Sequence, residues 1–389
     1  MNYVKIIHPA PRPGHSRSLQ GARGFGLIEL MVAMVIALVI LAALVALFIG
    51  TSRNNREMAT ANSVIDNGRF AIQLLESDLV HAGFWGTHVP RYDDQTSDAV
   101  PADVPGSVPD PCLAYDVTNW NNAYTNSLIG TPVQVYEDAA VCTGVVTNKV
   151  AASDILVVRH AELCVPGVGG CEADTNGKLY IQSSLCTTDL NAYAFGPTGS
   201  TTFPLLRRNC TTAAEKRKFV SHIYWVRNFA VTAGDGIPTL VRSEFDLVSG
   251  TLAHQPPVAL IEGIDAMRIE IGVDDVSRTG GAVNYTQAVQ WDNPATRTAA
   301  VNRGDGIPDG AFVRCTTLAP CDIGDFMNAT AVRVYLLARS RETTPGYTDT
   351  KIYTLGSAGT VGPFNDGFKR HVYSTTVRLI NVSGRRERP

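Results

Sequence analysis

An apolar run from Phe25 to Ile49 contains a single charged residue, Glu29. At about 1.5 Å of rise per residue, a helix of this length spans roughly 37 Å, whereas the hydrocarbon core of a bilayer is about 30 Å thick. A carboxylate inside such a segment costs on the order of 2.5 to 3.5 kcal/mol to insert, so it needs a partner or a wetted position at the interface. The run therefore predicts a membrane-spanning helix over residues 25–50, with Glu29 as a candidate functional residue.

The segment before this run, residues 1–24, is basic and ends in a small residue. An ordinary secretory signal is cut after its apolar core, but here the small residue precedes the core. Cleavage after Gly24 would leave Phe25 as a new N-terminus with the apolar run still attached. Positive charge before the span predicts a cytoplasmic leader, with the bulk of the chain across the membrane. The four cations of the leader, which contains no acidic residue, are Lys5, Arg12, Arg17 and Arg23.

The sequence Gly-Phe-Gly-Leu-Ile-Glu-Leu from Gly24 to Leu30 resembles the class III leader of type IV prepilins and type II secretion pseudopilins. This resemblance implies that a membrane-embedded peptidase cuts after Gly24 and methylates the amine of Phe25. It also implies that Glu29 pairs with the N-terminal amine of a neighbouring subunit. The pairing is physically reasonable, because an amine and a carboxylate in lipid can satisfy each other where neither is stable alone.

The helix is expected to continue from Phe25 to about His81, since no proline occurs between Phe25 and Val89. Residues 51–86 then form an amphipathic continuation of the membrane helix. Gly68 lies within its apolar stripe and permits a close approach of the backbone to a sheet. Alternating spacings of three and four place on this stripe Met58, Ala61, Ile65, Gly68, Ile72, Leu75 and Leu79. The opposite, polar face is expected to carry Arg53, Arg56, Asn62, Asp66, Arg69, Gln73 and Asp78.

A second resemblance extends over much of the remaining chain. The segments 67–86, 260–274, 332–339 and 372–379 are similar to PilW-type minor pilins. The stretch from about Thr87 to Thr212 carries little of this resemblance. Any partner of that stretch therefore cannot be carried over from the family.

Residues 87–389 are expected to form a globular head across the membrane, large enough to bury its own core. The whole chain has a net charge of −3, and loss of the basic leader leaves about −7, which argues against a nucleic-acid partner. Apolar and β-branched runs separated by Gly, Pro and Asp predict strands. They lie at 155–158, 179–181, 219–226, 239–241, 267–273, 332–337 and 372–380. The predicted fold is α+β, a long helix packed on an antiparallel sheet, with large loops between Pro90 and Ala151.

All eight cysteines lie beyond the apolar run: Cys112, Cys142, Cys164, Cys171, Cys186, Cys210, Cys315 and Cys321. In an oxidising compartment an even set indicates disulfides, although eight cysteines allow 105 pairings. Bridges between Cys164 and Cys171 and between Cys315 and Cys321 are geometrically easy. A zinc site is the competing interpretation, but no Cys-x-x-Cys pair or suitably spaced histidine supports it.

Two copies of Gly-Asp-Gly-Ile-Pro begin at Gly234 and Gly304. The second offers Asn302, Asp305 and Asp309 as oxygen ligands for calcium, but it lacks a downstream bidentate glutamate. A Gly/Pro turn beside a strand is the simpler interpretation.

The sequence contains no hydrolase, zinc-protease or P-loop motif, so no catalytic residue and no cofactor is expected. The histidines at 160, 222, 254 and 371 are interpreted as surface or packing residues.

The resemblance implies a minor pilin that initiates pilus assembly, attachment or twitching motility at or near the tip of a type IV pilus. Its expected partners are other minor and major pilins, the prepilin peptidase and a large tip adhesin, with no nucleic acid. It is expected first in the inner membrane with a periplasmic head and then outside the cell in the pilus. A minor pseudopilin of type II secretion shares the same leader. A membrane-anchored periplasmic binding protein or enzyme remains the alternative from a different class.

Overall fold

Helix α1 runs without a break from Leu27 to Leu79 in the computed structural model, which describes Gly24 and residues 26–387. It begins and ends two residues inside the predicted limits of Phe25 and His81. The chain divides into two compact units, Met1–Glu57 and Met58–Pro389, and α1 contributes residues to both. In the first unit every α1 residue from Leu27 to Thr51 is exposed, as expected of a helix whose surroundings are lipid or other subunits.

In the second unit α1 buries one line of side chains, formed by Val64, Gly68, Ala71, Leu75, Asp78 and Leu79. The predicted apolar stripe is therefore wrong at Met58 and Ile65, which are 61% and 39% exposed. The buried line passes instead through Val64 and Ala71, which pack in the core with residues of both sheets. The prediction that Asp78 lies on the polar face is also wrong, since its carboxylate is buried among polar partners from two strands.

The head contains two main antiparallel sheets, and the predicted α+β fold is confirmed. The larger, eight-stranded sheet has the order β1–β2–β5–β3–β4, and β6 pairs with β5, β7 and β8. Its strands are β1 (Val133–Tyr136), β2 (Ile155–Ala161), β3 (Leu179–Ser183), β4 (Tyr193–Pro197), β5 (Lys216–Arg227), β6 (Thr239–Val248), β7 (Thr251–His254) and β8 (Val258–Glu262). The smaller sheet has the order β13–β10–β9, with β9 (Ile264–Val273), β10 (Ala329–Arg339) and β13 (Arg370–Arg378). A two-stranded ribbon pairs β11 (Tyr353–Thr354) with β12 (Thr360–Val361).

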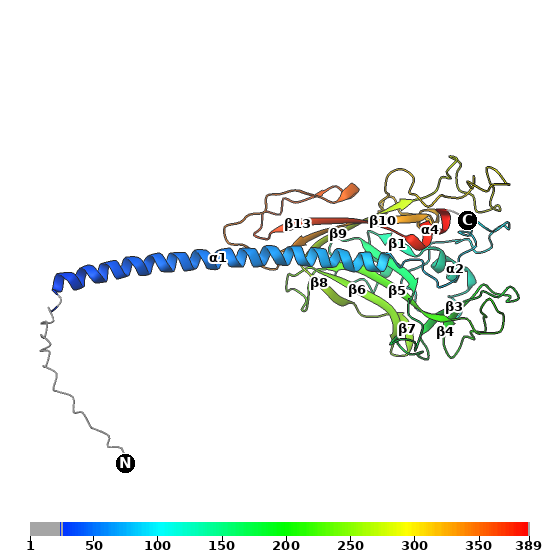
Figure 1. Cartoon of the computed structure of the whole chain (residues 1–389), viewed down its shortest axis with the longest axis horizontal. Coiled ribbons are helices and arrows are strands. Elements are labelled where there is room, and N and C mark those ends of the chain that lie inside the picture. Colours follow the sequence, from blue (N-terminus) through cyan, green and yellow to red (C-terminus); the bar gives the residue numbers. More distant parts are fainter. Residues whose placement is uncertain (1–23, 25, 388–389) are drawn as a thin grey trace, which may run out of the picture. The chain divides into compact units, whose positions relative to one another are not determined.

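The main hydrophobic core forms where the second half of α1 meets both sheets. Apolar residues of α1 pack there with residues of β1, β2, β5 and β6 from one sheet and of β9, β10 and β13 from the other. Figure 1 shows this part of α1 running alongside strands of both sheets. A separate aromatic core lies around Trp85, Trp120, Phe219 and Phe245. The helix is therefore the common packing partner of the two sheets.

A buried carboxylate also joins the two sheets directly. Asp154, which precedes β2, accepts a hydrogen bond from the backbone N–H of Ile269 on β9 at 2.9 Å. Its Oδ1 also lies 2.7 Å from Arg268 and 2.8 Å from Arg314. Because Asp154 is fully buried, these partners offset the cost of removing its charge from water.

Short helices occur where none was expected. The segment 90–151, predicted as loops, contains α2 (Asn122–Gly130), β1 and the 3₁₀ helix η1 (Ala139–Cys142), so that prediction is wrong in part. The Asn121 side chain caps α2 by accepting from the backbone N–H of Tyr124 at 3.1 Å. The strand predicted to reach Ile380 ends at Arg378, and α4 (Ile380–Glu387) follows. The other short elements are α3 (Ile323–Met327) and the 3₁₀ helix η2 (Gly356–Ala358).

Candidate functional site

The predicted processing site lies immediately before α1. Gly24 is exposed, whereas Phe25, the predicted site of methylation, lies outside the described residues. Glu29 is in the first turn of α1, and its Oε2 accepts a hydrogen bond from the backbone N–H of Gly26 at 3.0 Å. A carboxylate at this position interacts favourably with the positive end of the helix dipole. The side chain is exposed and thus also open to a second positive partner.

Among the described residues, α1 is the helix that is long and apolar enough to cross a membrane by length and composition. Its most apolar window has a mean hydropathy of 3.3 and no buried residue. A continuous apolar surface of this length is unfavourable in water and marks a lipid or protein contact.

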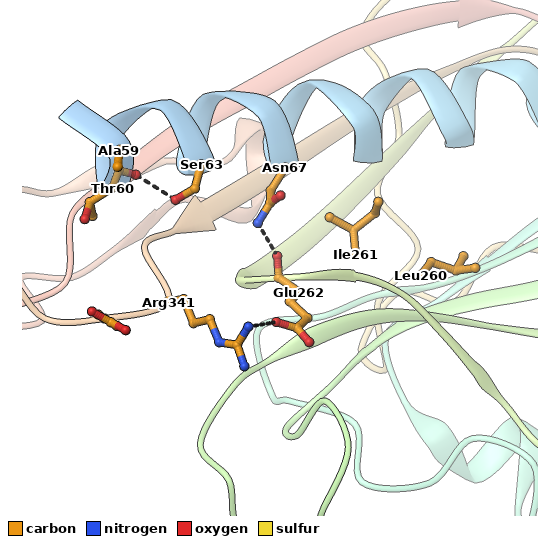
Figure 2. Close-up of a pocket in the computed structure, with 9 residues that line it drawn as sticks. Ala59, Thr60, Ser63, Asn67, Leu260, Ile261, Glu262 and Arg341 are labelled. Atoms are coloured by element: carbon orange, nitrogen blue, oxygen red, sulfur yellow. Dashed lines mark hydrogen bonds and ion pairs between the residues drawn. The ribbon is translucent and has the colours of Figure 1, made fainter. Parts of the chain in front are cut away.

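A groove of about 560 Å³ lies beside the second half of α1, entirely within residues 58–389. Figure 2 shows Asn67 pointing from α1 to the backbone of Glu262, with Arg341 meeting the Glu262 carboxylate. The Asn67 amide donates to the Glu262 carbonyl at 3.0 Å, and the Arg341–Glu262 ion pair spans 3.2 Å. These contacts attach α1 to the end of β8. The groove is lined by Ala59, Thr60, Ser63, Asn67, Leu260, Ile261, Glu262, Arg341 and Glu342.

The backbone at the end of β8 explains why the chain turns so tightly beside the helix. Gly263 separates β8 from β9 and has a φ of +75°. A Cβ at this position would lie 2.7 Å from the carbonyl oxygen of Arg339. Only glycine fits both the left-handed conformation and the close approach of β10.

All eight cysteines form disulfides, as predicted. The two sequence-local bridges are present, and the two pairings that the sequence left open are now assigned. The four bridges are Cys112–Cys142, Cys164–Cys171, Cys186–Cys210 and Cys315–Cys321. Two of them close long loops in the segment between α1 and β5.

Two sequence comparisons fit this arrangement of a basic leader, an apolar helix and a disulfide-bonded head. Residues 223–381 match the family of the type IV pilus-assembly protein W, and residues 19–50 match the prokaryotic N-terminal methylation motif. The chain belongs to the PilW family. No curated protein matches it. A solved type IV-like pilin from Thermus thermophilus is similar at 15% identity, with a TM-score of 0.21, over 54% of this chain and 87% of that one.

The PilW match begins within β5 and ends within α4, so it includes the entire three-stranded sheet. Three of the segments that resembled PilW-type pilins, 260–274, 332–339 and 372–379, lie inside it. The fourth, 67–86, lies outside both matched segments, and its resemblance stays a prediction. The PilW family is one of pilus-assembly proteins and not of enzymes. The methylation motif and the apolar helix are those of a membrane-anchored pilin.

The calcium candidates of this PilW-family chain each accept a hydrogen bond from a different backbone N–H group. Asn302 accepts from Gln290, Asp305 from Ile307, and Asp309 from Val276. Calcium binding by these residues stays a prediction. In the first Gly-Asp-Gly-Ile-Pro copy, backbone donors, that of Ile237 foremost, lower the pKa of Asp235 to about 2. This carboxylate organises a turn, in agreement with the simpler interpretation.

The sequence analysis missed a buried polar cluster at the end of α1. Asp78 lies 3.0 Å from His160 Nε2 and 2.9 Å from His222 Nδ1, and it accepts from the hydroxyl of Tyr224 at 2.9 Å. Burial by itself raises the pKa of Asp78, but hydrogen bonds from the two histidines dominate and hold it well below its ordinary value. The only sequence signal was an acidic residue near the apolar line of the helix. The two histidines are 62 positions apart, so only strand pairing brings them together.

Proposed function

We propose that this PilW-family protein is a minor pilin, inserted in the inner membrane as a prepilin and then incorporated at or near the tip of a type IV pilus. There it helps to initiate assembly, surface attachment or twitching motility. One observation carries the proposal. A single helix joins the prepilin motif to the core of the head, exposing its apolar first half and burying one line of its second half.

This division of α1 supports a role in assembly rather than simple anchoring. A membrane anchor needs about 20 apolar residues, whereas α1 is 53 residues long and continues into the head. A helix that is fixed to two sheets at one end can align its apolar end with the helices of neighbouring subunits. Glu29 would then set the register by meeting the N-terminal amine of the next subunit in a low-dielectric environment.

The proposed partners are other minor and major pilins, the prepilin peptidase and a large tip adhesin. A role as a minor pseudopilin of type II secretion uses the same leader and the same helix. Co-purification distinguishes the two machines. The proposal predicts that the protein is found in sheared pili and not with a secretin-linked pseudopilus.

The Glu29→Val variant tests the assembly role directly. It should enter the membrane and be cleaved normally, but its amount in sheared pili should fall several-fold, because an unpaired amine is costly in lipid. Glu76→Val, which removes an exposed glutamate from the second half of the same helix, is the matched control. Equal amounts of both variants in pili would rule out the pairing role of Glu29.

A further inference from the structure

Strand pairing places three polar side chains of the larger sheet on the face that packs against α1. In the antiparallel register of β2 and β5, Val158 faces His222, His160 faces Val220, and Leu156 faces Tyr224. Because side chains alternate along a strand, His160, His222 and Tyr224 project from the same face. Asp78, in the last turn of α1, is directed into this group.

The hydrogen bonds of His160 determine which of its ring nitrogens carries a proton. Its Nδ1 lies 2.9 Å from the carbonyl oxygen of Ala161, which can only accept. In a neutral ring Nδ1 therefore carries the hydrogen, and Nε2 presents a lone pair. This Nε2 atom lies 3.0 Å from Oδ1 of Asp78, which also presents lone pairs. The arrangement requires a cation between the two atoms, either a proton or a metal ion.

The surroundings of His160 match those of a metal ligand. A metal-bound imidazole almost always donates its other N–H to a backbone carbonyl or a carboxylate, which fixes its orientation. The Ala161 carbonyl accepts in this way, and the Tyr224 hydroxyl donates to the second oxygen of Asp78 at 2.9 Å. His160 and Asp78 therefore already have the supporting hydrogen bonds that metal ligands need.

We propose that Asp78, His160 and His222 form a binding site for a divalent transition metal, with zinc as the expected ion. The three ligand atoms lie within 4.8 Å of one another. Zinc is bound at about 2.0–2.2 Å by imidazole nitrogen and carboxylate oxygen, so small side-chain rotations place all three atoms around one ion. Two imidazoles and one carboxylate suit zinc better than calcium or magnesium, which prefer oxygen ligands.

The depth of the cluster suits a structural ion. The side chains of Asp78, His160 and His222 are each about 10% exposed, so the cluster lies just below the surface. A metal there would connect the last turn of α1 to the two adjacent strands β2 and β5. The binding free energy of such an ion adds to the stability of the fold. Zinc would thus fasten the membrane helix to the larger sheet, a role that does not depend on the proposed function in the pilus.

Zinc stoichiometry of the full-length chain tests the proposal. The chain is purified in detergent with an affinity tag free of histidine, stripped with a chelator, equilibrated with zinc chloride, desalted and measured by inductively coupled plasma mass spectrometry. The wild type should retain one zinc per chain. Asp78→Asn and His160→Gln, each of which removes a ligand, should retain far less than one zinc per chain, whereas the buried-histidine control His254→Gln should match the wild type. Each variant is first checked for four intact disulfides and cooperative melting.

X-ray absorption of the zinc-loaded wild type provides a measurement that does not depend on variants that fold. Two imidazole ligands with oxygen neighbours and no sulfur are expected. The proposal is overturned if the wild type retains no stoichiometric zinc, if the variants bind as well as the wild type, or if the spectrum shows other ligands. In the absence of bound zinc, the cluster is a hydrogen-bonded ion pair in which the shared cation is a proton.

Discussion

Gly68 of α1 lies against the phenol ring of Tyr373 on β13 so closely that a Cβ on the glycine would overlap the ring. The Tyr373 hydroxyl donates to the carbonyl of Val64, one turn earlier in the helix, at 3.4 Å. The helix backbone therefore approaches the smaller sheet through a gap that only glycine leaves open. This contact joins the helix that carries the prepilin motif to the sheet within the PilW match.

Gly68→Ala is expected to destabilise the head even though alanine is the better helix former. The gain in helix propensity is about 1 kcal/mol, whereas overpacking of a close contact costs about 1 to 3 kcal/mol, so a net loss of roughly 1 kcal/mol is predicted. Thermal unfolding in detergent measures the change. Adding Tyr373→Leu should recover part of the loss, and Gly106→Ala, whose Cβ meets nothing within 4 Å, should be neutral. A stabilised Gly68→Ala variant would contradict the account.

Local signals explain what the sequence predicted well. The long helix follows from an apolar run continued by three- and four-residue spacings, and β2, β5, β9 and β10 follow from β-branched runs. The misplaced features depend on tertiary contacts. Asp78 is buried because two histidines meet it there, and Met58 is exposed because no sheet residue covers it. The pairing of Cys186 with Cys210 likewise depends on how loops fold over the sheet.

The buried guanidinium of Arg386 fixes α4 to the head. It lies 2.8 Å from Asp93 and 3.2 Å from Asp274, and donates to the carbonyl of Met327 at 2.9 Å. Arg386→Leu would leave two buried carboxylates with less compensation, so we expect a loss of about 3 to 5 kcal/mol in the free energy of unfolding. Denaturant titration checks this value. Arg207→Leu removes an exposed ion pair with Glu215 and should cost less than about 1 kcal/mol. Similar losses for both variants would show that the Arg386 cluster contributes little.

His88 makes the stability of the head depend on pH. Burial, together with the charges of Arg385 and Arg91, lowers its pKa from 6.5 to about 4. Above pH 6.5 the His88 side chain is neutral in both the folded and the unfolded chain, so the head keeps its full stability. As pH falls from 6.5 to 4, the unfolded chain takes up the proton first, and the free energy of unfolding decreases. The loss amounts to about 3 kcal/mol at pH 4.

His88→Leu removes this titration and tests the assignment. Its melting temperature should vary less than that of the wild type between pH 6.5 and 4. His371→Leu, which replaces an exposed histidine, should keep the wild-type dependence. Parallel pH profiles for His88→Leu and the wild type would exclude His88 as the source.

A disulfide that closes a longer loop should stabilise the head more than one that closes a shorter loop. Cys112–Cys142 has a sequence separation of 30 and Cys164–Cys171 a separation of 7. Loop-closure entropy predicts losses of about 3.6 and about 2.4 kcal/mol when each pair is replaced by alanine. Chemical denaturation of the two double variants gives the comparison. A larger loss at Cys164–Cys171 would show that native-state contacts outweigh chain entropy.

The intact mass of the purified head should show no free thiols before reduction and eight after it.

The most direct test of the central claim is the N-terminal sequence and mass of the protein from membranes of cells with and without the prepilin peptidase. The account predicts a mature chain that begins at N-methylated Phe25 when the peptidase is present. It predicts the intact leader, through Gly24, when the peptidase is absent. The same unprocessed N-terminus in both strains would contradict the pilin assignment and leave a membrane-anchored protein with a pilin-like leader.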